Sequence, residues 1–183
     1  ESAARFHDDV AEYIQQHPNV KLVFQPGTFQ IKYGADHLVN LYKQTELFFC
    51  NREEAQTILK SENKEIPDLI KGIRALGPKI VVITDGVKGA YALDGDKIWF
   101  MKNYPDPKPP YERTGAGDAF SSTFTAAIAL GLPITEALMW APINSMSVVQ
   151  YVGAQEGLLR RSQLEGYLAQ APADYRPQVF AKL

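Results

Sequence analysis

Cysteine is almost absent from this sequence, and so are long apolar runs and any excess of one charge. Cys50 is the one cysteine among 183 residues, which excludes an internal disulfide framework and favours a reducing, cytoplasmic location. No apolar run approaches the ~20 residues that span a bilayer. The formal net charge of −2 provides no electrostatic footprint for nucleic acid or for an anionic membrane surface. We therefore predict a cytoplasmic protein that binds neither.

Two familiar kinds of site are also missing from the sequence. A Walker A phosphate loop requires the string Gly-x4-Gly-Lys-Ser/Thr, which occurs nowhere in the chain. Neither a histidine pair nor a Cys-x-x-Cys spacing indicates a transition-metal site. Residues 1–9 are typical of an amphipathic helix and not of a signal peptide, and the first residue is not methionine. We expect the chain to be a fragment of a longer protein.

What is present is a globular composition with alternating elements. The chain is 45% hydrophobic and 22% charged, which suits one domain over residues 1–183. Short apolar runs alternate with segments of helical spacing, and this indicates an α/β fold with a mainly parallel sheet. The predicted strands cover residues 21–25, 47–50, 79–84, 89–93 and 97–101, the last two joined by an Asp-Gly turn as a hairpin. The predicted helices cover residues 3–16, 34–43, 51–60, 67–76, 116–130, 134–151 and 163–170, with Pro142 bending the sixth and Ser162 capping the seventh.

The segment from Thr114 to Phe120, with the sequence Thr-Gly-Ala-Gly-Asp-Ala-Phe, carries the clearest chemistry. Glycines at the start of a helix let the backbone approach a ligand, and the N–H groups of the first turn form an anion site at the positive end of the helix dipole. Asp118 lies in that same turn. A carboxylate beside an anion site is what phosphoryl transfer needs, because it can accept the proton of the attacking hydroxyl.

Two alternatives compete for this segment. The first is an ordinary helix start, in which Asp118 only interacts favourably with the dipole, by ~0.3–1 kcal/mol. The second is a dinucleotide-binding loop. Phe120 stands where that loop has its third glycine, and the segment follows a proline-rich loop in place of a strand. These departures count against the second alternative.

The segment Gly115-Ala116-Gly117-Asp118 resembles the C-terminal signature of the ribokinase-like (PfkB) carbohydrate kinases. Other segments resemble further family motifs, and they occur in the family's order over about residues 20–155. These are the Asn-x-x-Glu motif at Asn51–Glu54, the Thr-x-Gly-x-x-Gly nucleotide loop at Thr84–Gly89, a residue placed beside the adenine at Asn144, and the closing Gly-Ala turn at Val152–Ala154. The resemblance implies a three-layer α/β/α fold and an enzyme that transfers the γ-phosphate of ATP to a hydroxyl of a sugar or a sugar-like molecule.

The resemblance also assigns catalytic roles. Asp118 is the expected catalytic base, and the N–H groups of Gly115, Ala116 and Gly117 are expected to form the anion hole for the γ-phosphate.

The same resemblance assigns a metal and a nucleotide site, with a plainer structural alternative for each residue. Glu54 and Asn51 are expected to organise Mg²⁺ and its waters, although alone they would predict a helix capping box. The expected nucleotide ligands are Asn51, Thr84, Gly86, Gly89 and Asn144. Thr84, Gly86 and Gly89 could instead form a bare turn at the entry to a hairpin. Asn144 could satisfy carbonyls left open near Pro142.

Several points depart from the family pattern or lie outside this chain. Many members have Asp-Thr-Thr before the glycines, where this sequence has Glu112-Arg113-Thr114, so activation by a monovalent cation is doubtful. Arg113 is either a phosphate ligand or a solvated loop residue. In the family the sugar pocket and lid come mainly from an N-terminal half that precedes this chain. We therefore expect the fragment alone to be inactive, and an exposed strand edge to make it a homodimer.

Function within the family stays open at this point. The acceptor could be a sugar or a nucleoside, and no residue in the sequence separates the two. A non-catalytic nucleotide-binding or regulatory module would have no need of the base Asp118. A dinucleotide-dependent oxidoreductase is opposed by the missing third glycine.

Overall fold

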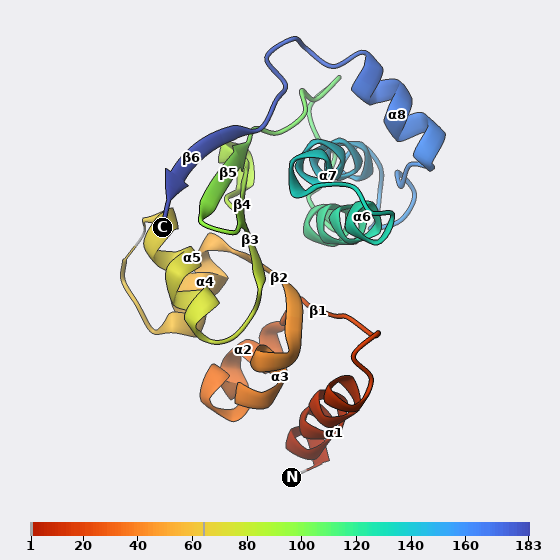
Figure 1. The fold of residues 1–183 in the computed structure, drawn as a ribbon. Coiled ribbons are helices and arrows are strands. Elements are labelled where there is room, and N and C mark those ends of the chain that lie inside the picture. Colours follow the sequence, from red (N-terminus) through yellow and green to blue (C-terminus); the bar gives the residue numbers. More distant parts are fainter. Residues whose placement is uncertain (1, 64) are drawn as a thin grey trace. The chain divides into compact units, whose positions relative to one another are not determined.

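The computed structural model describes residues 2–63 and 65–183 of the chain (Figure 1). The chain divides into two compact units: the first ends at Thr84 and also includes Leu183, and the second extends from Asp85 to Lys182. The prediction of a single domain over residues 1–183 stays a prediction. No helix in the described part of the chain is long and apolar enough to cross a membrane.

The first unit is built on three parallel strands. They are β1 (Leu22–Phe24), β2 (Thr45–Asn51) and β3 (Ile80–Thr84), with β2 paired to both others. The run Leu-Phe-Phe-Cys in β2 and the run Val-Val-Ile in β3 are buried, as expected for parallel strands covered on both faces. The helices are α1 (Ser2–Gln16), α2 (Thr28–Tyr33), η1 (Ala35–His37), α3 (Val39–Gln44), α4 (Arg52–Leu59) and α5 (Ile66–Ala75).

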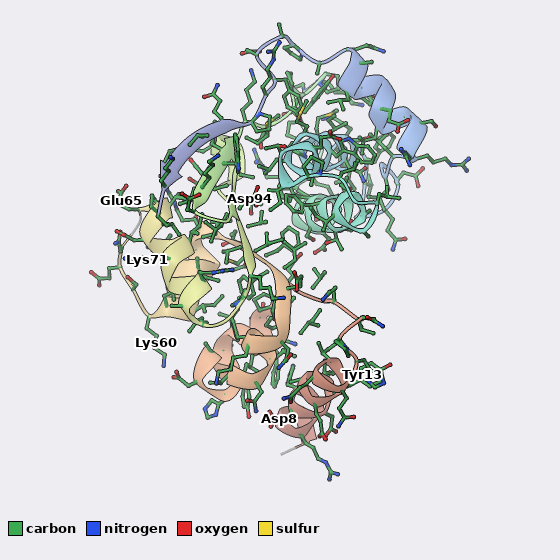
Figure 2. All side chains as sticks on the ribbon, in the orientation of Figure 1. Asp8, Tyr13, Lys60, Glu65, Lys71 and Asp94 are labelled. Carbon is green, nitrogen blue, oxygen red and sulfur yellow. The ribbon has the colours of Figure 1, made fainter. Side chains whose placement is uncertain are left out.

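The helices of the first unit pack on one another and on the strands. Helices α4 and α5 contact each other, α4 also contacts β2 and β3, and α5 contacts β3. The α5 side chains Leu69, Ile70 and Ile73 are buried. Helix α1 packs on α3, where the Asn40 amide donates a 3.1 Å hydrogen bond to Asp8, labelled in Figure 2. The apolar faces of these helices therefore supply the core that holds β2 and β3 in place.

The second unit joins an antiparallel meander to a pair of long helices. Its strands are β4 (Ala90–Asp94), β5 (Lys97–Met101) and β6 (Gln178–Lys182), and β5 pairs antiparallel with both others. Asp94, at the turn between β4 and β5, is labelled in Figure 2. Its helices are η2 (Gly86–Lys88), α6 (Ala116–Ala129), α7 (Ile134–Val148) and α8 (Arg161–Ala169). Helices α6 and α7 lie side by side in Figure 1, and α7 also contacts β4, β5 and α8.

The α/β fold class predicted from the sequence is confirmed, and the strands pair in a mixed manner: parallel in the first unit and antiparallel in the second. Two local predictions were wrong, and one strand was missed. The expected helix over 34–43 is two short pieces, η1 and α3, with Leu38 between them, and Gly34, at φ +96°, separates them from α2. Ser162 does not cap α8, whose N-cap is Arg160. Strand β6 was not predicted, because its short segment becomes a strand only by pairing with β5.

Candidate functional site

The first turn of α6 presents an exposed carboxylate beside an open backbone. Gly115 is the N-cap residue and adopts the left-handed conformation, with φ +79°. Gly117 and Asp118 are exposed on the first turn. A methyl group at Gly117 would meet no heavy atom within 4 Å among the described residues beyond its chain neighbours and its own helix. The N–H groups of a first helical turn have no partner within the helix, so this turn can accept an anion beside the Asp118 carboxylate.

One N–H of the predicted anion hole already has a contact in this structure. The Ala116 N–H donates to the Arg113 carbonyl at 3.3 Å, longer than an ordinary N–H···O bond. The Gly115 carbonyl accepts the Ala119 N–H at 2.8 Å, which begins the helical ladder. The Asp118 carbonyl also accepts the Ser121 hydroxyl at 3.3 Å. The turn is thus a regular helix start in which the Ala116 N–H is weakly engaged.

A second turn packs directly against this helix start. A methyl group at Gly115 would lie 2.7 Å from both Cα and Cβ of Ala154, so the two backbones are in close contact. The N–H of Gly153, which has φ +83°, donates to the side chain of Glu112. The Tyr111 N–H donates to the Val149 carbonyl at 2.8 Å. The segment before α6 is therefore fastened to the segment that follows α7.

Helix α7 is bonded to α6 through two of its side chains. The Ser145 hydroxyl donates to the Ala116 carbonyl at 3.0 Å. The Asn144 amide donates to the Thr123 hydroxyl at 2.7 Å, and its oxygen accepts the Leu159 N–H at 2.9 Å. Asn144 is 6% exposed, so both ends of its side chain serve the packing of α6, α7 and the segment before α8. Its predicted contact with adenine stays a prediction.

The segment from Thr84 to Gly89 forms a tight loop between β3 and β4. The Asp85 N–H donates to the Gly89 carbonyl at 2.8 Å, and the Asn103 amide donates to the Gly86 carbonyl at 2.9 Å. Gly89 adopts φ +110°, and a methyl group there would lie 2.3 Å from the Met101 carbonyl oxygen. Gly86 is exposed, with φ +53°. Only glycine therefore fits at position 89 without displacing β5, whereas position 86 is constrained by its conformation alone.

The residues predicted to bind the metal lie in the first unit, at the carboxyl end of β2. Asn51 ends β2, where it pairs with Thr84 of β3, and it is the N-cap of α4. Its side-chain oxygen accepts the Glu54 N–H at 2.8 Å, and a Glu54 carboxylate oxygen accepts the Asn51 N–H at 2.8 Å. Both residues are partly buried. This is a complete capping box, and it fixes where the Glu54 carboxylate lies.

Cys50 precedes this capping box and is not a candidate nucleophile. Its side chain is buried, and burial first, with the Glu54 charge second, raises the pKa of the thiol well above its usual range. Within the described ranges, no group of three or more His, Cys, Asp and Glu side chains could hold a metal ion. A cation carried mainly by phosphates and water needs fewer protein ligands than that.

Each unit thus gathers a part of the predicted site. The first unit brings together Asn51, Glu54 and Thr84, and the second holds the glycine loop, the first turn of α6 and Asn144. Sequence reasoning missed the contact of Glu112 with Gly153 and that of Asn103 with Gly86. A side chain that bonds a distant backbone leaves no periodic signal, so neither contact could have been read from spacing.

Comparison with known proteins gives consistent matches. The family model described as "pfkB family carbohydrate kinase" matches residues 7–161. A cytidine kinase of Thermococcus kodakarensis is 34% identical over 101 residues, which are 55% of this chain and 36% of that protein. A ribokinase of Bacillus subtilis is 36% identical over 96 residues, 52% of this chain and 32% of that protein. The chain therefore spans about a third of the length of these two curated relatives.

A solved structure extends the likeness to the fold. The structure of Arabidopsis thaliana ribokinase complexed with ribose and ATP superposes with a TM-score of 0.69 at 21% identity. The match covers 88% of this chain and 59% of that one.

Proposed function

Because the chain belongs to the pfkB family of carbohydrate kinases, we propose that it carries the ATP-binding and proton-accepting residues of a phosphotransferase. The enzyme would transfer the γ-phosphate of ATP to a hydroxyl of a sugar or sugar-like molecule. The observation that carries the proposal is the first turn of α6, where Gly115 adopts φ +79° and Gly117 leaves the backbone open beside the exposed Asp118.

The proposed chemistry uses charge and position. The substrate hydroxyl oxygen attacks the γ-phosphorus, Asp118 takes the hydroxyl proton, and the bond from phosphorus to the ADP oxygen breaks. The N–H groups of Gly115, Ala116 and Gly117 offset the negative charge on the phosphoryl oxygens. The 3.3 Å contact of the Ala116 N–H with Arg113 is weak enough to be exchanged for a phosphate oxygen. Helix α7 keeps this turn in register through Ser145.

The metal proposal concerns Asn51 and Glu54. Mg²⁺, when bound, neutralises phosphate charge and keeps most of its waters, so it takes few protein carboxylates. Glu54 fits that role because its carboxylate is held by the Asn51 N–H at 2.8 Å. The capping box serves as a support that fixes the carboxylate before any ion binds.

The nucleotide proposal adds Thr84, Gly86, Gly89 and Asn144. The loop between β3 and β4 exposes the Gly86 backbone and is closed by the hydrogen bond from Asp85 to Gly89, which suits a loop over phosphates. For Asn144 the support is weaker, since both ends of its amide are engaged inside the second unit.

A nucleoside is the second candidate acceptor. The observation that favours it is the 34% identity over 101 residues with a protein described as a cytidine kinase. The relative described as a ribokinase favours a sugar with similar strength. A panel of ribose, fructose, cytidine and adenosine, assayed with Mg·ATP on the natural protein at its full length, would decide between these two classes.

The test of the proposed function is titration of Mg·ATP into the natural protein and into its Asp118→Asn variant. We expect both to bind ATP with similar affinity, neither to bind NAD⁺, and turnover of the variant to fall by about 10²–10⁴-fold. Unchanged turnover in Asp118→Asn would refute the base assignment. ATP binding without turnover in the wild-type protein, on every acceptor of the panel, would favour a non-catalytic nucleotide-binding module.

A further inference from the structure

Glu112 stands three residues before the glycine that begins α6, and its side chain reaches a different segment of the second unit. Its carboxylate accepts the backbone N–H of Gly153, a charge-assisted hydrogen bond. Gly153 and Ala154 form the turn that packs against Gly115. The short segment from Glu112 to Gly115 therefore touches this turn twice, once through a carboxylate and once through bare backbone.

The position of Glu112 is itself fixed by the end of α7. The N–H groups of Tyr111 and Glu112 both point to the Val149 carbonyl, at 2.8 and 3.4 Å. The Gln150 amide donates to the Lys108 carbonyl at 3.2 Å, and Gln150 is 8% exposed. These hydrogen bonds hold the loop against the end of α7, and the Glu112 carboxylate holds the turn that follows.

Close packing explains why this tie matters to the first turn of α6. Gly115 has no side chain, and an added methyl group would lie 2.7 Å from Ala154, so the turn at Gly153 and Ala154 supports the helix start without a gap. If that turn moves away, Gly115 loses its support and the N–H groups that follow it change direction. Misplacement of reacting groups by about 1 Å can lower a rate by about 10²-fold.

We propose that Glu112 is a positioning residue, which clamps the Gly153–Ala154 turn against Gly115 and so sets the direction of the N–H groups that precede Asp118. This inference rests on the proposed phosphotransfer for its kinetic consequence, but its structural part does not. The proposal assigns Glu112 no contact with the phosphate. It acts through the backbone of Gly153.

The first test is amide hydrogen exchange in the 183-residue chain, measured residue by residue by NMR well below the melting temperature. Three variants are compared with the wild type: Glu112→Ala, Glu112→Gln, whose amide oxygen can still accept the Gly153 N–H, and the control Glu156→Ala, which removes an exposed glutamate nearby. We expect Glu112→Ala to speed exchange at Gly153 by roughly 10- to 100-fold and to loosen residues 114–118. The other two should stay within about twofold of wild type.

The second test is kinetics on the natural protein at full length. In Glu112→Ala we expect kcat to fall by about 10- to 100-fold with little change in the KM for ATP, because a misdirected anion hole affects the transition state more than ground-state binding. Glu112→Gln should restore most of the rate, which a role that depends on the charge of the carboxylate would not allow.

The outcomes separate this inference from the proposed function. Unchanged exchange at Gly153 and at 114–118 in Glu112→Ala would refute the clamp. Faster exchange accompanied by wild-type kcat would refute the positioning role of Glu112 in the reaction. If the wild-type protein transfers no phosphate to any acceptor, the proposed function fails. The exchange data would still decide whether Glu112 holds this turn.

Discussion

Replacing Gly115 by alanine should destabilise the fold, whereas replacing Gly117 by alanine should leave the fold intact and weaken ATP binding. In Gly115→Ala the new methyl group lies 2.7 Å from Cα and Cβ of Ala154, and the residue must keep φ +79°. In Gly117→Ala the methyl group meets nothing within 4 Å in the described part of the chain, outside its neighbours and its own helix. The pair therefore separates the role of the backbone in folding from its role in binding.

The magnitudes follow from these contacts. For Gly115→Ala, the left-handed conformation costs about 1–2 kcal/mol and overpacking against Ala154 costs about 1–3 kcal/mol. The free energy of unfolding should therefore fall by about 2–5 kcal/mol, or about 4–20 °C in melting temperature for a chain of this size. For Gly117→Ala, alanine favours a helical position over glycine by about 0.5–1 kcal/mol, so stability should be unchanged or slightly higher.

Gly117→Ala, which should leave stability unchanged, should instead weaken the binding of ATP. Its methyl group fills the open space through which an anion reaches the first turn of α6, so ATP affinity should drop at least about tenfold, which corresponds to about 1.4 kcal/mol. The assays are urea unfolding followed by circular dichroism, and calorimetric titration of Mg·ATP at a temperature where every variant is folded. If Gly117→Ala binds ATP like the wild type, the first turn of α6 is not the anion site. If Gly115→Ala is as stable as the wild type, the close contact with Ala154 does not exist in solution.

Two further predictions test residues whose structural and functional roles overlap. Glu54→Gln keeps an oxygen that can accept the Asn51 N–H, so stability should change by less than about 0.5 kcal/mol. Its loss of charge should raise the Mg²⁺ concentration needed for half-maximal activity at least about tenfold, and an unchanged requirement would leave only the capping role. Asn144→Ala leaves the Thr123 hydroxyl and the Leu159 N–H without their partner, at a cost of about 2–4 kcal/mol, measured by urea unfolding. A stability equal to wild type would contradict the observed hydrogen bonds, and weaker ATP binding in the folded variant would support the predicted contact with adenine.

The sequence was most informative where the cause of a structure is local. The helix at Arg52–Leu59 begins at Asn51 because that residue and Glu54 cap each other within one turn. The buried strand at Ile80–Thr84 follows from a run of β-branched residues bounded by Pro78 and Gly86. The glycines before Asp118 identified the start of α6 and its chemistry for the same reason. In each case, residues within eight positions of one another determine the outcome.

The sequence failed where the cause is distant. Strand β6 exists because β5 offers it a partner some 80 residues earlier in the chain, and no short pattern announces such a pairing. Gly34 has the left-handed geometry that ends α2, but a glycine in a sequence does not reveal which neighbouring segment it will end. The same limit applies to Asn144, whose partners Thr123 and Leu159 are 21 and 15 positions away in the chain.

The sequence alone determined the α/β class, the family resemblance, the base candidate Asp118 and the glycines beside it, because these depend on residue types at short, fixed spacings. The tertiary structure decided how that turn is supported. It placed Ala154 against Gly115, paired the Glu112 carboxylate with the Gly153 N–H, and buried Asn144 of α7 against α6. These contacts arise when helices and loops far apart in sequence are packed together to bury apolar surface, and packing partners at that distance are fixed only by the folded chain as a whole.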